Sequence, residues 1–210
     1  MKGYYFITEP ALSRAGVMSD TANVLKVGAT IVQYRQKSGS SAVLYAEALE
    51  LRKMCRSAQF LVNDRIDIAL AVDADGVHVG RDDLPVPVVR RLLRPGKIIG
   101  VTVRTLDEAV RASDEGADYL GVGPIFSTAT KGDAGRPVGI DLVREIRREC
   151  KLPLAAIGGI TLANAREVIA AGADMICAVS AVVSAPDVEQ AVRAFQNQFL
   201  TSDCDRKETV

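Results

Sequence analysis

Short apolar stretches alternate with longer amphipathic stretches along almost the whole chain. The apolar stretches are typical of buried strands, and the amphipathic ones have apolar residues at helical spacing. We predict eight strands, within residues 4–8, 28–35, 60–62, 73–80, 98–101, 116–123, 154–157 and 172–179. We predict helices between them, over residues 22–27, 42–57, 65–72, 86–93, 106–115, 142–149, 162–171 and 188–200. Asp20 and Thr21 are expected to cap the first of these helices.

Four of the predicted strands begin in the same way. The stretches GATIVQYR, DADGVHVG, GADYLGVG and GADMICAV each place a glycine or small residue after an amphipathic helix. Glycine is the usual stop at the carboxyl end of a helix, because it adopts a positive φ without steric cost. An Asp or Thr and an apolar strand follow, so these four stretches indicate an internal repeat.

Strands that alternate with helices predict a parallel sheet with right-handed crossovers. Eight such units fit an α/β fold of the single (β/α)8 TIM-barrel type. The barrel is expected to be one domain over residues 1–200, and the polar residues 201–210 are expected to form a disordered tail. The alternative is an open doubly wound sheet, which is disfavoured because no GxGxxG turn follows the first strand.

Composition excludes several classes of protein. Lys and Arg total 26, as do Asp and Glu, and this balance argues against a general nucleic-acid binder. No apolar run approaches the ~18 residues of a membrane span, and the apolar start of the chain is too short for a signal peptide. Four cysteines without CxxC spacing and one histidine give poor support to a zinc site. We expect reduced thiols in a cytoplasmic protein.

In a TIM barrel, the loops after the strands form the active site. The loop after the sixth strand contains Ser127, Thr128, Thr130 and Lys131, which are hydroxyls and a cation that suit a phosphate. Gly158 and Gly159 follow the seventh strand, and Ser180 follows the eighth. Barrels frequently bind phosphate at these last two positions, so we predict a phosphate site there.

The other strand ends are also polar. Gln33, Arg35 and Lys37 alternate after the second strand, and the fifth strand ends at Thr102 and Arg104. Asn63 and Asp64 follow the third strand, and Asp83 follows the fourth.

Asp64 and Asp83 are expected to end neighbouring strands. Two close carboxylates repel each other unless a cation lies between them, and Mg²⁺ commonly takes one or two protein carboxylates. The alternatives are that Asp64 caps a helix and that Asp83 belongs to a turn. His78 lies inside an apolar strand, and we interpret it as a packed, hydrogen-bonded core residue.

Five motifs resemble thiamine-phosphate synthase. They are QYRQK at 33–37, VNDRIDIALAVDADGVHVGRDDLP at 62–85, GVGPIFSTATKGDAGRPVG at 121–139, AIGGIT at 156–161 and AVS at 178–180. The resemblance runs from about Tyr4 to Phe199, with the motifs in the family's order.

The resemblance implies a transferase that joins hydroxymethylpyrimidine diphosphate to thiazole phosphate and releases pyrophosphate. It implies a dissociative step through a pyrimidine carbocation, assisted by Mg²⁺ on Asp64 and Asp83. The pyrimidine diphosphate would be held by Gln33, Arg35, Lys37, Asn63, Thr102 and Lys131. The thiazole phosphate would be held by Thr128, Thr130, Gly159, Val179 and Ser180. Among these, Arg35, Lys37, Thr102 and Lys131 are the expected catalytic residues.

Two positions depart from the family's pattern. Arg104 stands where the family usually has His, and Arg81 stands where Gln is usual. Two other functions are therefore weighed. A thiazole tautomerase on the same barrel is disfavoured because it relies on that His. A non-catalytic thiazole-phosphate regulator is disfavoured because buried charges without a ligand are costly. Small-molecule substrates are the expected partners, with a homo-oligomer possible and neither nucleic acid nor membrane expected.

Overall fold

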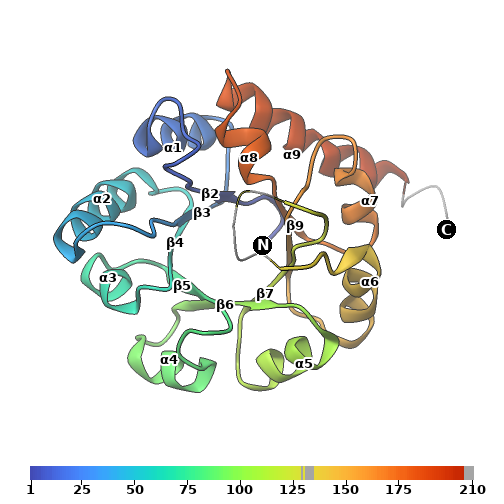
Figure 1. The fold of residues 1–210 in the computed structure, drawn as a ribbon, viewed down its shortest axis with the longest axis horizontal. Coiled ribbons are helices and arrows are strands. Elements are labelled where there is room, and N and C mark those ends of the chain that lie inside the picture. Colours follow the sequence, from blue (N-terminus) through green and yellow to red (C-terminus); the bar gives the residue numbers. More distant parts are fainter. Residues whose placement is uncertain (129, 131–134, 206–210) are drawn as a thin grey trace.

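The computed structural model describes residues 1–128, 130 and 135–205, with side chains up to residue 200. Within these residues, nine strands form one parallel sheet that curls into a ring, and the helices surround it (Figure 1). The strands are β1 (Gly3–Tyr4), β2 (Phe6–Ile7), β3 (Ile31–Tyr34), β4 (Gln59–Asn63), β5 (Gly76–Val79), β6 (Ile98–Val103), β7 (Tyr119–Val122), β8 (Leu154–Ile157) and β9 (Met175–Cys177). The predicted TIM-barrel fold is confirmed.

The first predicted strand closes the barrel by pairing on both sides. Its first half, β1, pairs with β9, and its second half, β2, pairs with β3. The division falls at Tyr5, whose N–H donates to the carbonyl of Ile176 at 3.0 Å. The two short strands therefore occupy the position of one strand in an eight-unit barrel. An open doubly wound sheet, whose edge strands are unpaired, is excluded.

The predicted helices are found with shifted ends. They are α1 (Val17–Lys26), α2 (Ser41–Met54), α3 (Ile66–Ala71), α4 (Val86–Leu92), α5 (Leu106–Asp114), α6 (Gly139–Glu149), α7 (Ala165–Ala170) and α9 (Val188–Asp205). A further short helix, α8 (Val179–Val183), follows β9 directly and was not predicted.

The expected cap of the first helix is wrong. Because α1 begins at Val17, Asp20 and Thr21 lie inside the helix, where both are buried. The hydroxyl of Ser13 donates to Asp20 Oδ2 at 2.6 Å and accepts from the N–H of Gly16 at 2.8 Å. These polar groups thus fasten the preceding loop to the helix.

Two apolar layers hold the barrel together. The larger one lies between the strands and the helices. The smaller one fills the interior of the barrel and consists of Tyr5, Ile7, Ile31, Leu61, Tyr119, Ala155, Met175 and Cys177. Residues two apart on a strand face the same side, so the polar side chains that follow along these strands also face inward, nearer the mouth.

Glycines make room for the two largest rings inside the barrel. A Cβ at Gly100 would lie 2.0 Å from Cζ of Tyr119, its partner on the neighbouring strand. A Cβ at Gly121 would lie 2.9 Å from Cε1 of His78. Because real Cβ atoms do not approach so closely, the positions of both rings depend on these glycines.

The repeated Asp at the start of a strand has a structural role. In three of the four repeats, one oxygen of this carboxylate accepts from a backbone N–H at the start of the preceding strand. An Arg from a helix pairs with the same Asp side chain. All these contacts are between 2.7 and 3.1 Å. The sets are Asp75 with Phe60 and Arg52, Asp118 with Ile99 and Arg90, and Asp174 with Leu154 and Arg147.

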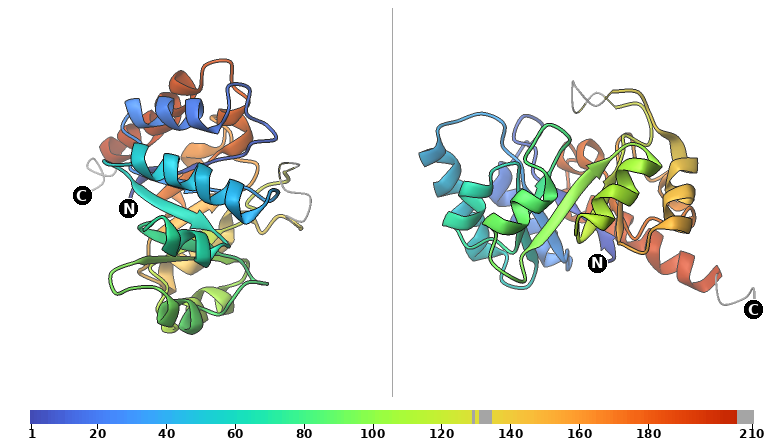
Figure 2. Two further views of the ribbon diagram at one scale, coloured as in Figure 1. Left: turned by 90° about the vertical axis from the view of Figure 1, so that its left-hand side faces the viewer. Right: turned by 90° about the horizontal axis from the view of Figure 1, so that it is seen from below.

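The last helix extends beyond the predicted end of the barrel domain. α9 packs against α1, α7 and α8, and its far end projects past the barrel (Figure 2). It includes residues 201–205, and residues 206–210 of the expected tail lie outside the described part of the chain. The domain boundary at residue 200 therefore stays a prediction. Among the described helices, none has the length and apolarity that crossing a bilayer requires.

Replacing Asp174 by Ala should lower the free energy of unfolding by about 2 kcal/mol. The change removes a charge-assisted bond to the N–H of Leu154 and leaves Arg147 without its carboxylate. Urea denaturation followed by circular dichroism would measure this loss. Asp141→Ala is the control, since its pair with Arg144 is exposed and should contribute less than about 1 kcal/mol. Equal losses in both variants would contradict a special role for the repeated Asp.

Candidate active site

A cavity of about 290 Å³ opens at the carboxyl ends of the strands. Nine of the residues predicted to bind substrate line it, and they come from several strands and the loops after them. They are Gln33, Arg35, Asn63, Thr102, Thr128, Thr130, Gly159, Val179 and Ser180. Residues far apart in the sequence thus converge because the closed barrel brings all strand ends to one mouth.

Three other predicted site residues that the structure describes, Lys37, Asp64 and Asp83, do not line this cavity. Lys37 lies beyond the end of β3 and is exposed, so strand alternation does not fix its direction. Lys131 lies outside the described residues. Asp64 and Asp83 are half-buried next to lining residues, since Asn63 and Asp82 belong to the lining.

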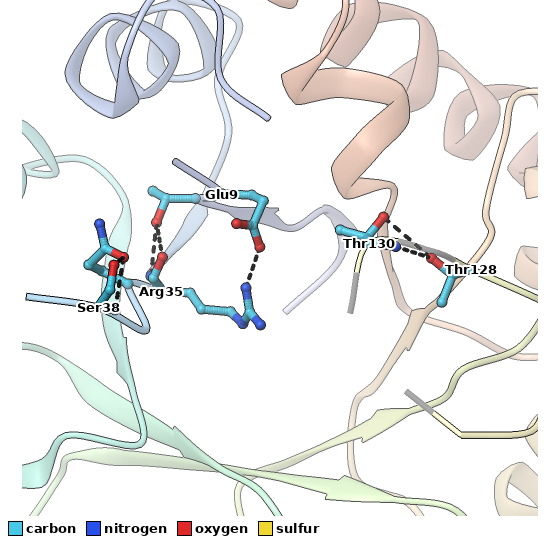
Figure 3. A network of polar contacts seen from close by, with 7 residues as sticks. Glu9, Arg35, Ser38, Thr128 and Thr130 are labelled. Carbon is cyan, nitrogen blue, oxygen red and sulfur yellow. Dashed lines mark hydrogen bonds and ion pairs between the residues drawn. The ribbon is translucent and has the colours of Figure 1, made fainter. Parts of the chain in front are cut away.

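Arg35 is held by two neighbours from the loop after β2. Its guanidinium forms an ion pair with Glu9, and both side chains are largely buried (Figure 3). Its backbone N–H donates to the hydroxyl of Thr8 at 2.8 Å, and that hydroxyl donates to the carbonyl of Arg35 at 3.1 Å. Arg35 is therefore positioned, and its charge is compensated by Glu9.

The threonines of the loop after β7 form a second polar group. Thr128 Oγ1 donates to Thr130 Oγ1 at 3.3 Å and accepts from the N–H of Thr130 at the same distance. Figure 3 places this pair across the opening from Arg35 and Glu9. The cavity thus has a charged side and a hydroxyl side.

The paired glycines after β8 are required by the backbone. Gly158 and Gly159 have φ values of 99° and 63°, which side chains disfavour. A Cβ at Gly159 would lie 2.5 Å from the carbonyl oxygen of Ser127. Asn164 fastens this turn, because its amide donates to the carbonyl of Gly159 at 3.1 Å and accepts from Thr161 N–H at 2.8 Å. The GG sequence therefore lets two loops meet at the cavity.

Asp64 and Asp83 follow β4 and β5, which are paired neighbours. Asp64 has a φ of 61°, an unusual value for a residue with a side chain and one that is enriched at functional sites. It does not cap α3, since the N-cap residue is Arg65. Asp83 Oδ2 accepts from the N–H of Gly80 at 2.6 Å, so the turn that we considered as its alternative role is present.

The described residues contain no cluster of three or more His, Cys, Asp or Glu side chains that could hold a metal by themselves. Two carboxylates nevertheless suit Mg²⁺, which retains several waters and takes oxygens from substrate phosphate. The pair is therefore compatible with a magnesium site that the ligands complete.

The two arginines that depart from the family's pattern share one carboxylate. Arg81 Nε pairs with Glu108 Oε1 at 3.1 Å, and the backbone N–H of Arg104 donates to Glu108 Oε2 at 2.6 Å. The guanidinium of Arg104 donates to the carbonyl of Arg136 at 2.8 Å. Arg104 thus ties the end of β6 to the far side of the loop after β7.

The lining residues that were missed or misjudged from the sequence include Glu9, Tyr5 and His78. Glu9 follows the first strand, so the rule applied to the other strand ends would have found it. Nothing in the sequence distinguished Tyr5 from the neighbouring Tyr4, because the division of the first strand was not predicted. His78 is hydrogen-bonded, as we expected, but it lines the cavity and is not sealed in the core.

Burial favours the protonated forms of two phenols and one thiol at the floor of the cavity. It raises the pKa of Tyr5 and of Tyr119, both of which are buried. Burial also raises the pKa of the Cys177 thiol, which lines the same cavity. The described Cys55, Cys150 and Cys177 are free thiols, and burial raises the pKa of Cys55 to about 12. No thiolate nucleophile is therefore expected here.

Comparison with known proteins identifies the family. The model of the thiamine monophosphate synthase family matches residues 4–182. Thiamine-phosphate synthase of Chloroflexus aurantiacus is 53% identical over 192 residues, which cover 90% of this chain and 88% of that protein. Its counterpart from Methanosarcina mazei is 48% identical over 193 residues, which cover 91% and 80%. A solved structure, thiamine phosphate pyrophosphorylase from Pyrococcus furiosus, superposes with a TM-score of 0.88 at 40% identity and covers 95% of this chain and 96% of its own. The chain belongs to the thiamine monophosphate synthase family, whose members named here are transferases.

Proposed function

We propose that the protein forms thiamine phosphate from 4-amino-2-methyl-5-hydroxymethylpyrimidine diphosphate and hydroxyethylthiazole phosphate, with release of pyrophosphate. The observation that supports this most directly is the convergence of nine expected substrate-binding residues on one cavity. That cavity has a charged side and a hydroxyl side, which suits one diphosphate and one monophosphate ligand.

The charged side would bind the pyrimidine diphosphate. Arg35 supplies a guanidinium that is already oriented by Glu9, and Gln33 and Asn63 supply amides beside it. Lys37 and Lys131 would add point charges to the diphosphate, as the family resemblance implies. Preorganised donors of this kind stabilise charge as it develops on a leaving group.

The hydroxyl side would bind the thiazole phosphate. Thr128, Thr130 and Ser180 offer hydroxyl donors, and the backbone at Gly159 can approach a phosphate closely because no side chain intervenes. Val179 would pack against the apolar ring between these donors.

In the proposed reaction, the C–O bond between the pyrimidine methylene and the diphosphate breaks first. The electron pair leaves with pyrophosphate, and the methylene carbon becomes the carbocation centre. The thiazole nitrogen then donates its lone pair to this carbon and forms the new C–N bond. No proton needs to move, so Arg35, Lys37, Thr102 and Lys131 are assigned to binding the departing anion and none to acid–base chemistry.

Asp64 and Asp83 would hold the Mg²⁺ that the family resemblance implies. When bound, this ion would neutralise charge on the diphosphate oxygens. The positive φ of Asp64 supports this assignment, because such backbone conformations cluster at functional sites. The turn that orients the carboxylate of Asp83 supports it as well. A cytoplasmic location and a homo-oligomeric state stay expectations.

Incubation with both substrates and Mg²⁺ should yield thiamine phosphate and pyrophosphate in equal amounts. Chromatography of the products would measure both. Conversion of a thiazole tautomer without pyrophosphate release would instead assign the protein as a tautomerase. Tight binding of thiazole phosphate with no product would assign it as a regulator.

Arg35→Ala should lower kcat/KM for the pyrimidine diphosphate by roughly 10²–10³, the scale for losing one preorganised donor to a developing anion. Steady-state kinetics with varied pyrimidine diphosphate would measure it. Arg14→Ala is the matched control, because Arg14 is an exposed arginine on the neighbouring loop. A loss below threefold in Arg35→Ala would remove this residue from the mechanism.

Asp83→Asn should lower Mg²⁺-dependent turnover by about two orders of magnitude, since the metal's role is worth several kcal/mol. The amide oxygen can still accept from the N–H of Gly80, so the turn should persist. Magnesium titrations of activity would measure the effect. Asp82→Asn removes the same charge one residue away, and an equal effect of both variants would indicate general electrostatics and no specific ligand.

A further inference from the structure

A chain of hydrogen bonds crosses the interior of the barrel from Gln33 to Thr102. Gln33 Nε2 donates to the hydroxyl of Tyr5 at 2.6 Å, and this hydroxyl lies 2.7 Å from that of Tyr119. The hydroxyl of Tyr119 lies 2.7 Å from His78 Nδ1, and His78 Nε2 lies 2.8 Å from Thr102 Oγ1. Both ends of the chain, and Tyr5 and His78 within it, line the cavity.

This polar chain lies where a barrel normally has apolar packing. Tyr5 and Tyr119 are fully buried, and Gln33 is 2% exposed. Gly100 and Gly121 leave the space that the rings of Tyr119 and His78 occupy. Buried polar groups are costly unless every one has a partner, so four consecutive bonds in one place need an explanation beyond filling space.

The orientation of the Gln33 amide sets the direction of the bonds. Because Gln33 donates to Tyr5, the hydroxyl of Tyr5 is left to donate to Tyr119. The hydroxyl of Tyr119 then donates to Nδ1 of His78, which requires a neutral imidazole with its proton on Nε2. The opposite direction would need the amide of Gln33 to turn so that its oxygen accepts from Tyr5, and it would place the imidazole proton of His78 on Nδ1.

We infer that Tyr5, Tyr119 and His78 are positioning residues that fix which hydrogen-bonding groups the cavity presents to its ligand. With Nε2 of Gln33 engaged by Tyr5, the amide oxygen of Gln33 faces the ligand as an acceptor. With Nε2–H of His78 donating to Thr102, the hydroxyl proton of Thr102 is directed away from His78 and serves as a donor. The site therefore selects a ligand with an N–H donor at one end and an anionic oxygen at the other.

The identity of that ligand rests on the proposed function. An aminopyrimidine diphosphate has this pattern, with its amino group as donor and its phosphate oxygens as acceptors. A pyrimidine with an oxo group in place of the amino group would place an acceptor against the amide oxygen of Gln33. Sites built around buried hydrogen bonds reject such mismatches strongly.

The first test uses the protein without any ligand. Because the chain has a single histidine, ¹⁵N labelling of histidine gives one unambiguous imidazole in heteronuclear NMR. We expect the neutral Nε2–H tautomer in the parent. Tyr119→Phe should convert this to a mixture of tautomers, because Nδ1 loses its donor. An Nδ1–H tautomer in the parent, or an unchanged tautomer in Tyr119→Phe, would overturn the inference.

The second test measures ligand selection. Calorimetry without thiazole phosphate would compare the Kd values of the amino and oxo pyrimidine diphosphates. Tyr5→Phe frees the amide of Gln33 to turn, so the preference for the amino form should fall about tenfold or more. Tyr4→Phe is the matched control, because this neighbouring buried hydroxyl bonds to the carbonyl of Ala178 and does not line the cavity.

The outcomes separate the two proposals. An unchanged preference in Tyr5→Phe, with the parent still selective, would overturn the inference and leave the proposed function intact. A parent that binds neither pyrimidine diphosphate would overturn the proposed function. The tautomer of His78 would then decide the direction of the chain by itself.

Discussion

Closure of the sheet through its first strand is the constraint on which the rest of the structure depends. This strand is shared between β9 and β3, and its two halves meet at Tyr5. Without that double pairing, the sheet would have two edges and its strand ends would spread along a line. With it, loops that follow β3, β6, β7 and β8 face one another around a single mouth (Figure 1). The closed topology thus creates the cavity, and the particular side chains then determine what the cavity can bind.

A closed barrel must also fill its own interior, and this one does so with polar rings. Tyr119 fits because its neighbour on β6 is Gly100, and His78 fits because Gly121 lies beside it. The same packing that stabilises the barrel therefore sets the position of a hydrogen-bonding group on the cavity floor. Stability and ligand selection are coupled here, since moving either ring changes both.

The sequence predicted the fold, and it named most of the polar residues that line the candidate site, because both follow from local patterns. Period-two and helical spacing locate the elements, and the strand-end rule finds residues such as Asn63 and Thr102 without knowledge of their partners. What failed depends on contacts between distant segments. Asp20 looks like a cap, but its partner is Ser13 in the preceding loop. His78 looks like a core residue, and only the register of β5, β6 and β7 shows that its nitrogens meet Tyr119 and Thr102.

Several of the described charged side chains at the mouth of the cavity are already paired. We therefore expect the site to recognise its ligands by the positions of its hydrogen-bond donors more than by a net positive charge. Arg35 is already paired with Glu9, and Arg81 is paired with Glu108. The guanidinium of Arg104 donates to the carbonyl of Arg136. This residue, which stands where the family usually has His, therefore bonds to the loop after β7. A polyanion that enters must therefore share or displace carboxylates, which costs affinity unless its oxygens meet donors in fixed positions. The fixed hydroxyl of Thr102, the glycine turn after β8 and the threonine pair after β7 meet that requirement, since each is oriented by bonds made before any ligand arrives.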